Sequence, residues 1–353
     1  MRLFLSVDLV GSTAFKARLG DAREGNDSNP LWVSQIRHFY REFPIFLFSR
    51  FNKALGAVEG DRTYKDCCPK VWKTIGDEIL FCTRLHSLEH LAHCVSSFLR
   101  ALEDYGAYLD SNGKHLDVKG AGWVAAFPAP NVTVEVLGSS SVLGSASERE
   151  LKEPFDEEFE LLADNNPSSF DFLGKEIDSG FRSAKNAASD RFTASIELAL
   201  LLAESAHVEI FPGRFSYHGR QVLKGVISDH PYPVVTIDAE RSMTRKEVRK
   251  REKAISKDTD VDPMHLRDFL RSFMEDEKID LPLLNRDHNV TAPLTMPSCY
   301  AVFQEVWEAS AKEYSQRAAE EVASESALDG TMTDLPPSIS DALQDAVSKV
   351  ENE

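Results

Sequence analysis

The order in which β-prone runs and helical patterns follow one another along the first 130 residues restricts the fold more than any other feature. Its elements are a strand at residues 3–10 (LFLSVDLV), a helix at about 31–51, two strands in VWKTIGDEILFCTRL, a helix at 86–109 and a strand in LDVKGAGWVAAFPA. Gly76 and Asp77 interrupt the strand pair as a tight turn would. The order βα-ββ-α-β predicts an α+β sandwich, in which helices pack on a sheet.

The second half of the chain continues this pattern and then changes character. The segment GSSSVLGSASERELKEPFDEE is typical of a flexible or inserted region, and helical periodicity returns from about Asp178 to Glu204. Two strands, FSYHGRQVLKGV and YPVVTID, then complete a domain that we expect to span residues 1–240. Residues 241–353 are highly charged and later rich in Ala, Glu and Ser, which predicts a helical extension with a mobile end.

Composition excludes several classes of protein. The formal net charge of −17 would repel a polyanion, and no strong basic patch offsets it, so we expect no nucleic-acid partner. No run of 18 apolar residues predicts a membrane span, and the start MRLFLSVDLVGST does not read as a signal peptide. Five cysteines without regular spacing do not form a disulfide framework. We therefore expect a cytoplasmic protein.

Two carboxylates at the ends of predicted central strands are the main candidates for chemistry. Asp8 lies in VDLVGST and Asp77 in TIGDEIL, and adjacent strand ends would bring them close together. Two divalent ions, Mn²⁺ or Mg²⁺, roughly 4 Å apart could bind between them. The following residues Gly11, Ser12 and Thr13 form a turn before a helix, where backbone N–H groups could hold phosphates. The alternative is that each Asp only caps a turn.

Further cations lie later in the chain. Arg182 follows Asp178 by four residues, which places both on one face of a helix, where Arg182 could stabilise charge on a phosphate in transit. Lys224 and Arg220, in GRQVLKGV, offer cations for outer phosphates. The alternatives are a surface salt bridge for Arg182 and a solubility role at a strand edge for the other two. The chain has no GxxxxGK[ST] pattern and is not a P-loop enzyme.

Taken in order, these motifs resemble those of class III nucleotidyl cyclases over about residues 1–240. VDLVGST is similar to the first metal motif, KTIGDEILF to the second, FLG followed by IDSGFR to the transition-state helix, and LKG to the late phosphate-binding strand. The resemblance implies a ferredoxin-like sandwich and a lyase that releases pyrophosphate. It implies metal ligation by Asp8, Leu9 and Asp77, a transition-state role for Arg182 and a triphosphate contact for Lys224. It also implies a head-to-tail homodimer with shared active sites.

A finer resemblance concerns the base. Asp178 stands where the family usually has an Asn that orients the ribose, and VWKTIGDE with IDSGFRSAK looks more like the bacterial pyrimidine cyclases of Pycsar anti-phage systems. Such enzymes convert UTP or CTP to cyclic UMP or cyclic CMP, which activates a separate effector protein. The alternatives are an adenylyl or guanylyl cyclase and a sensor domain that binds nucleotide without turnover.

Lys73 and Asp171 fall where adenylyl cyclases keep the pair that reads adenine. Uracil, cytosine and adenine can each satisfy a Lys and an Asp, so the pair excludes none of them, and it could instead be a structural ion pair. The neighbouring Trp72 either narrows the base pocket or points into the core.

Two other patterns have ordinary explanations beside functional ones. The row His86, His90, His93 and Cys94 has helical spacing that a zinc site could use, although it also fits an amphipathic helix. The charged run from Arg241 to Lys257 predicts a solvated helix, with partner binding as the other possibility.

Overall fold

The computed structural model describes residues 1–19, 30–56, 66–112, 116–136, 157–256, 260–286, 300–305, 308, 309, 312 and 316. The chain forms two units, Met1–Tyr300 and Ala301–Glu353. The segment at 138–158, which the sequence predicts to be flexible or inserted, lies largely outside the described residues.

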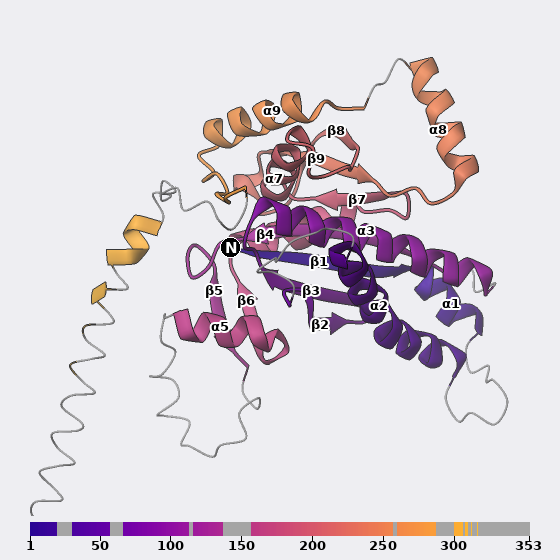
Figure 1. Ribbon diagram of the computed structural model, residues 1–353, viewed down its shortest axis with the longest axis horizontal. Helices are drawn as coiled ribbons and strands as arrows, with labels where there is room; N and C mark the ends of the chain where they lie inside the picture. Colours follow the sequence, from indigo (N-terminus) through magenta and orange to yellow (C-terminus); the bar gives the residue numbers. More distant parts are fainter. Residues whose placement is uncertain are drawn as a thin grey trace, which may run out of the picture. The chain divides into compact units, whose positions relative to one another are not determined.

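A seven-stranded sheet organises the first unit (Figure 1), in the order β2-β3-β1-β4-β7-β9-β8. Its strands are β1 (Arg2–Val10), β2 (Lys70–Ile75), β3 (Glu78–Arg84), β4 (Asp117–Ala125), β7 (Arg191–Ala194), β8 (Phe215–Val222) and β9 (Pro231–Asp238). A separate two-stranded sheet pairs β5 (Val132–Glu135) with β6 (Phe170–Leu173). All neighbours in the large sheet are antiparallel except β4 and β7. The order β2-β3-β1-β4 is ferredoxin-like, so the predicted α+β sandwich is confirmed.

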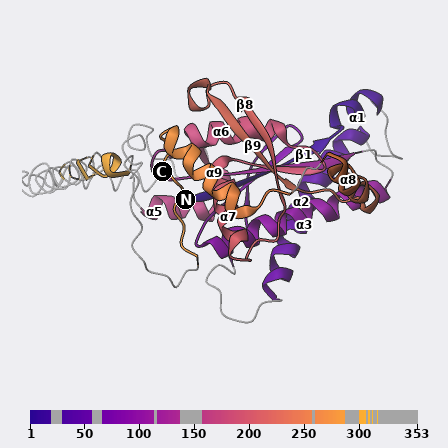
Figure 2. The same cartoon turned by 90° about the horizontal axis from the view of Figure 1, so that it is seen from above.

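Helices cover both faces of the large sheet (Figure 2). The helices of the first unit are α1 (Ser12–Leu19), α2 (Leu31–Gly56), α3 (Leu88–Ser111), α5 (Glu157–Asn165), α6 (Lys175–Ser183), α7 (Ile196–His207), α8 (Met243–Ser256) and α9 (Pro263–Asp276). Apolar residues of α2, α3 and α7 form one core with the sheet, and residues of α5 and α6 form a second core on the opposite face. None of the described helices is long and apolar enough to cross a membrane.

The alternation of side chains along β1 assigns its residues to these two cores. Leu3, Leu5, Val7 and Leu9 enter the core with α2 and α3, whereas Phe4 enters the other core. Because the period of a strand is two residues, Ser6 and Asp8 share the face of Phe4. That face is therefore apolar at the start of β1 and polar at its end.

The structure corrects the prediction of continuous helical periodicity from Asp178 to Glu204. Helix α6 ends at Ser183, and the four-residue strand β7 precedes α7. Strand β7 pairs with β4 on one side and β9 on the other. A strand of four residues is too short to reveal its period, and here the pairing partners decide its conformation.

Beyond residue 240 the described part of the chain forms the helices α8 and α9. Helix α9 packs against α7, and buries Leu266, Leu270, Phe273 and Met274. The compact unit therefore continues past residue 240, and we keep 1–240 and 241–353 as a proposed division between catalytic domain and extension.

An arginine buried at the start of β1 ties α5 to the sheet. The side chain of Arg2 pairs with Glu160 at 2.5 Å and Asp164 at 2.6 Å, and donates to Thr133 in β5. Its guanidinium also lies 4.9 Å from the ring centroid of Phe172. Buried charges of this kind are tolerated because each has a partner.

We expect the substitution Arg2→Ala to lower the free energy of unfolding by about 3–5 kcal/mol, because Glu160 is left buried without a cation. Chemical denaturation followed by circular dichroism measures this loss. The control is Arg100→Ala, which removes an exposed pair with Glu103 and should cost less than about 1 kcal/mol. Equal losses in both variants would contradict the role of Arg2.

Candidate functional site

Asp8 lies near the end of β1, between two strands that bring charged groups to it. In the antiparallel ladders its cross-strand neighbours are Glu78 in β3 and Lys119 in β4. The Nζ atom of Lys119 lies 3.0 Å from Oδ2 of Asp8, and both side chains are partly exposed. Asp8 is thus neither buried in the core nor a turn cap, and its carboxylate remains accessible at the polar end of the face.

Asp77 lies beside this point, in the tight turn that joins β2 and β3. Gly76 adopts a φ of 65°, the left-handed conformation that such two-residue turns require. The carbonyl of Asp77 accepts a hydrogen bond from the backbone N–H of Leu9 at 3.2 Å. Its carboxylate accepts one from the hydroxyl of Ser12, at the start of α1. Asp77 and the residue that follows Asp8 are therefore in direct contact.

A third carboxylate makes this end of the sheet strongly acidic. Burial raises the pKa of Glu78 above its ordinary value, and the negative charges of Asp8 and Asp77 raise it further. A hydrogen bond from the hydroxyl of Ser6 partly offsets this effect. The ammonium of Lys119 pairs with one member of this group, Asp8. An acidic group of this composition favours binding of a cation.

Carboxylate oxygens are the ligands that Mg²⁺ and Mn²⁺ prefer, so Asp8, Asp77 and a backbone carbonyl such as that of Leu9 fit these ions. Among the residues that the structure describes, no group of three or more His, Cys, Asp and Glu side chains is arranged as a complete metal site. Magnesium commonly takes one or two protein carboxylates and completes its shell with water and substrate phosphates. The donor set here suits that mode of binding.

Gly11 alone connects β1 to α1, because Ser12 and Thr13, which the sequence places in a turn before the helix, form the first turn of α1 itself. Gly11 has a φ of 87°, and α1 begins at Ser12. Ser12 is buried and bonded to Asp77, whereas Gly11 and Thr13 are exposed. Because Gly11 and Thr13 are exposed at the start of a helix, they remain candidates for the predicted binding of phosphate.

Lys73 and Asp171 come together as an ion pair across β2 and β6, with Nζ 2.7 Å from Oδ1. Both side chains are about one third exposed, at 34% and 36%. A ligand can therefore reach the pair and compete with it. Trp72 is buried in the core and donates to the carbonyl of Phe170 at 3.0 Å, so it does not narrow a base pocket.

Arg182 and Asp178 occupy α6, on the same face of the sheet as Phe4. The helix carries acidic residues in its first turn and Arg182 in its last, an order that matches the helix dipole. Gly180 packs directly on the indole of Trp123, and a Cβ at this position would overlap the ring at 2.3 Å. That contact fixes α6 on the sheet, with Asp178 exposed and Arg182 partly exposed.

The guanidinium of Arg182 lies against the turn that joins β8 and β9. A Cβ at Gly225 would be 3.7 Å from Nη2 of Arg182. Lys224 precedes this glycine and is exposed in the turn after β8, rather than within the strand as the sequence predicts. The structure therefore brings Arg182 and the Lys224–Gly225 turn together.

These cations and the carboxylates lie toward opposite ends of the sheet. Val10 pairs with Asp117 at the end of β1, and the register through β4, β7 and β9 puts Asp238 at that same end. The turn between β8 and β9 follows Val222, which pairs with Pro231 at the other end. Seven residue steps along β9 span about 24 Å. Lys224 and Asp8 of one chain are therefore too far apart to bind one phosphate.

Sequence reasoning missed four polar residues around the carboxylates. Cross-strand register places Lys119, Glu78 and Ser6 beside Asp8. Tyr40 of α2 donates a hydrogen bond to the carbonyl of Gly76. A polar residue in a mostly apolar strand is the signal that could have identified Lys119.

Of the predicted row, His86 precedes α3, with its Nε2 3.3 Å from Sγ of Cys67, whereas His90 and His93 lie on the helix and contact backbone carbonyls. His90 is buried and its Nε2 lies 3.0 Å from the carbonyl of Cys67, while Nε2 of His93 lies 2.9 Å from that of Phe51. Burial lowers the pKa of His90 to about 3, which keeps its imidazole neutral. These contacts support the reading of an amphipathic helix.

Comparison with known proteins gives only distant similarity. No protein-family model matches the chain, and no curated protein matches it in sequence. Among solved structures, it is similar to the adenylyl cyclase CyaB from P. aeruginosa, at 11% identity and a TM-score of 0.40, over 69% of this chain and 97% of that one. A bacterial light-regulated adenylyl cyclase matches at 11% identity and a TM-score of 0.39, over 77% and 56%. The catalytic core of a rhodopsin-guanylyl cyclase with converted specificity, in complex with ATPαS, matches at 10% and 0.36, over 67% and 94%. Similarity at this level does not assign an activity.

We expect Lys119→Met to tighten Mn²⁺ binding by about tenfold, because the substitution removes a cation that competes for Asp8. Isothermal titration calorimetry of the nucleotide-free protein measures this affinity. Lys73→Met is the control, since it removes an ammonium that pairs with Asp171 instead. An unchanged affinity in the Lys119 variant would show that its ion pair with Asp8 does not oppose metal binding.

Proposed function

We propose that this protein is a nucleotidyl cyclase of the class III type. It would close a nucleoside triphosphate into a 3′,5′-cyclic monophosphate and release pyrophosphate. The observation that carries the proposal is the contact between the ends of β1 and the β2–β3 turn, which joins Asp8 and Asp77 in one accessible acidic site. Two acids in matching motifs at one strand end are the donor set that such an enzyme needs.

In this proposal residues 1–240 form the catalytic domain, and Asp8, Leu9 and Asp77 would hold two Mn²⁺ or Mg²⁺ ions. When bound, the ions would supply activation of the 3′-hydroxyl and neutralisation of the triphosphate. Ser12 would keep the carboxylate of Asp77 oriented toward the site through its hydrogen bond. Lys119, already paired with Asp8, would be available to phosphate oxygens once cations satisfy that carboxylate.

The reaction forms a bond between the 3′-oxygen and the α-phosphorus, while the bond from that phosphorus to the leaving pyrophosphate breaks. The hydroxyl proton is released as the new bond forms. Charge on the transferring phosphoryl group must be stabilised, and Arg182 would do this through its guanidinium. Lys224 would contact the outer phosphates, and Asp178 would face the ribose from the same side of α6.

A head-to-tail homodimer would account for the separation of these groups. Asp8 and Lys224 of one chain lie toward opposite ends of the sheet. A second copy related by a two-fold axis would bring its own Arg182 and Lys224 to the carboxylates of the first. Each dimer would then contain two equivalent sites, with metal ligands from one chain and phosphate-binding cations from the other.

The base is assigned to a pyrimidine, with UTP or CTP as substrate and cyclic UMP or cyclic CMP as product. Support comes from the sequence, through Asp178 in place of Asn and the IDSGFRSAK context. Lys73 and Asp171 would read the base edge, and their partial exposure leaves them accessible to it. By the same resemblance, the product would activate a separate effector in anti-phage defence. An adenylyl or guanylyl cyclase is the second candidate, because the same pair also suits adenine.

The shared site is tested by mixing two inactive variants. Asp77→Ala and Arg182→Ala should each lack turnover, and a mixture should regain about one quarter of wild-type activity, since half of the randomly formed dimers hold one intact site of two. Product formation is measured by mass spectrometry with Mn²⁺ and each nucleotide. Mixed Asp77→Ala and Asp8→Ala proteins are the control and should stay inactive. Failure to regain activity despite demonstrated subunit exchange would contradict a shared site.

For the base, we expect the wild-type protein to turn over UTP or CTP faster than ATP and GTP at equal concentration. Asp171→Ala should lower turnover of the preferred nucleotide and reduce the preference by roughly tenfold, because an unpaired donor costs about 1–3 kcal/mol. Competition assays with all four nucleotides measure the preference. A wild-type preference for ATP or GTP would replace the pyrimidine assignment with the second candidate.

A further inference from the structure

Helix α8 carries charge of the opposite sign to the rest of the chain. It contains six Lys and Arg residues and two Glu residues, a formal charge of +4, within a protein whose formal net charge is −17. Large apolar side chains on this helix are also exposed: Met243 at 78%, Val248 at 59% and Ile255 at 84%. Val248 and Ile255 are seven residues apart and therefore lie on the same side of the helix. A basic helix with exposed apolar residues is suited to bind an acidic partner.

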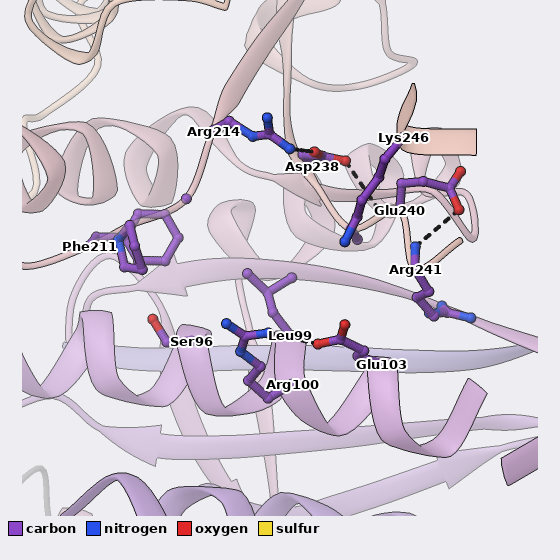
Figure 3. A pocket seen from close by; sticks show the side chains of 13 residues that line it. Ser96, Leu99, Arg100, Glu103, Phe211, Arg214, Asp238, Glu240, Arg241 and Lys246 are labelled. Carbon is purple, nitrogen blue, oxygen red and sulfur yellow. Dashed lines mark hydrogen bonds and ion pairs between the residues drawn. The ribbon is translucent and has the colours of Figure 1, made fainter. Parts of the chain in front are cut away.

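Ion pairs connect the first half of α8 to the sheet. Arg249 pairs with Asp190 and with Asp238 at the end of β9. Arg241, in the segment between β9 and α8, pairs with Asp117 at the start of β4. Figure 3 shows the side chain of Lys246 directed from α8 into a cavity of about 180 Å³, beside Glu240 and opposite Arg100 of α3. These contacts hold the first turns of the helix, whereas Ile255 lies beyond them.

The position of α8 relates it to the proposed catalytic site. Asp117 and Asp238 mark the same end of the sheet as Val10, two residues after Asp8. Figures 1 and 2 agree in drawing α8 at the end of the first unit where α1 follows β1. This is the end that needs a second copy if the active site is shared.

The opposite end of the same unit is acidic. The turn between β8 and β9 is joined to the end of α9 by a hydrogen bond of 2.8 Å between His230 and Glu277. Around this junction lie Asp229, Glu275, Asp276 and Glu277, which we call the acidic tip. Lys224 and Lys278 are exposed beside them, so four carboxylates and two ammonium groups leave a formal charge of −2 here. The side chains of Asp229, Glu275 and Asp276 are exposed.

We infer that α8 is a dimerisation element that binds the acidic tip of a second copy of this chain. The inference rests on the proposed function only for the head-to-tail orientation. Two copies of a chain of charge −17 repel each other unless complementary patches meet. In a head-to-tail pair the carboxylate end of each copy meets the far end of the other, so two-fold symmetry would bring together α8 and the acidic tip twice. Val248 and Ile255 would be covered at the same contact.

Dimer dissociation constants, measured by sedimentation velocity at low ionic strength, test this inference without any assay of activity. We expect Lys250→Glu on α8 and the double substitution Glu275→Lys, Asp276→Lys at the acidic tip each to weaken the dimer by about tenfold. A chain with all three substitutions should regain most of the wild-type affinity, because the charges are exchanged. Lys53→Glu on α2 is the matched control for a single reversal and should leave the dimer unchanged.

The contribution of apolar side chains to dimer affinity is tested with a second matched pair of variants. Ile255→Asp on α8 should weaken the dimer, whereas Ile45→Asp on α2, which is also an exposed isoleucine on a helix, should not. Circular dichroism of each variant verifies that the fold is intact. A wild-type chain that stays monomeric, or unchanged dissociation constants in the α8 and tip variants, would overturn the inference.

The two proposals can fail separately. If the α8 variants still dimerise normally while mixed Asp77→Ala and Arg182→Ala proteins regain activity, the dimer contact through α8 is wrong and the shared site stands. If the charge exchange restores the dimer but no nucleotide is turned over, the contact stands and the proposed activity fails.

Discussion

The placement of β1 between β3 and β4 is the constraint on which the rest of the site depends. Its two antiparallel ladders set Asp8 opposite Glu78 on one side and Lys119 on the other. A shift of the register by one residue would turn Asp8 and Ser6 into the core with α2 and α3, and would expose Val7 and Leu9. Burial of the apolar residues on both faces therefore fixes the position of the acidic group. The chemistry of the site follows from packing elsewhere in the same strand.

The two faces of the sheet differ in how far an apolar core covers them. The face under α2, α3 and α7 is closed by an apolar core that runs the length of β1. The other face is closed only over Phe4 and its neighbours, where the rings of Trp72, Trp123 and Phe172 pack together. Beyond Phe4 the same face becomes polar at Ser6 and Asp8. Our proposals assign both a ligand and a second chain to this polar, acidic surface.

The distribution of charge between the two ends of the sheet also supports the proposed head-to-tail dimer. Carboxylates and the basic helix α8 lie at one end of the sheet, and Lys224 with the acidic tip at the other. An isolated chain would gain nothing from this asymmetry, since the groups are too far apart to interact strongly through water and salt. In a head-to-tail dimer each end would meet its complement. The proposed shared site and the proposed α8 contact are separate consequences of that one geometry.

Local patterns in the sequence were sufficient to predict β1, the β2–β3 turn, α2, α3 and β4, because each is long or is marked by a glycine at its turn. The candidate residues Asp8, Asp77, Arg182 and Lys224 could also be named from motifs. The sequence could not reveal β7, whose four residues become a strand only through pairing with β4 and β9. It could not assign Trp72 to the core, because a strand residue next to a polar neighbour can face either way. Cross-strand register, which depends on the packing of both faces at once, places Lys119, Glu78 and Ser6 in the site. The separation of Arg182 from Asp8 depends on the arrangement of the whole sheet. Residue types and their spacing thus determined which residues are candidates for the proposed chemistry, while the tertiary structure decided which groups meet, since distances across a sheet are set by pairing between strands far apart in sequence.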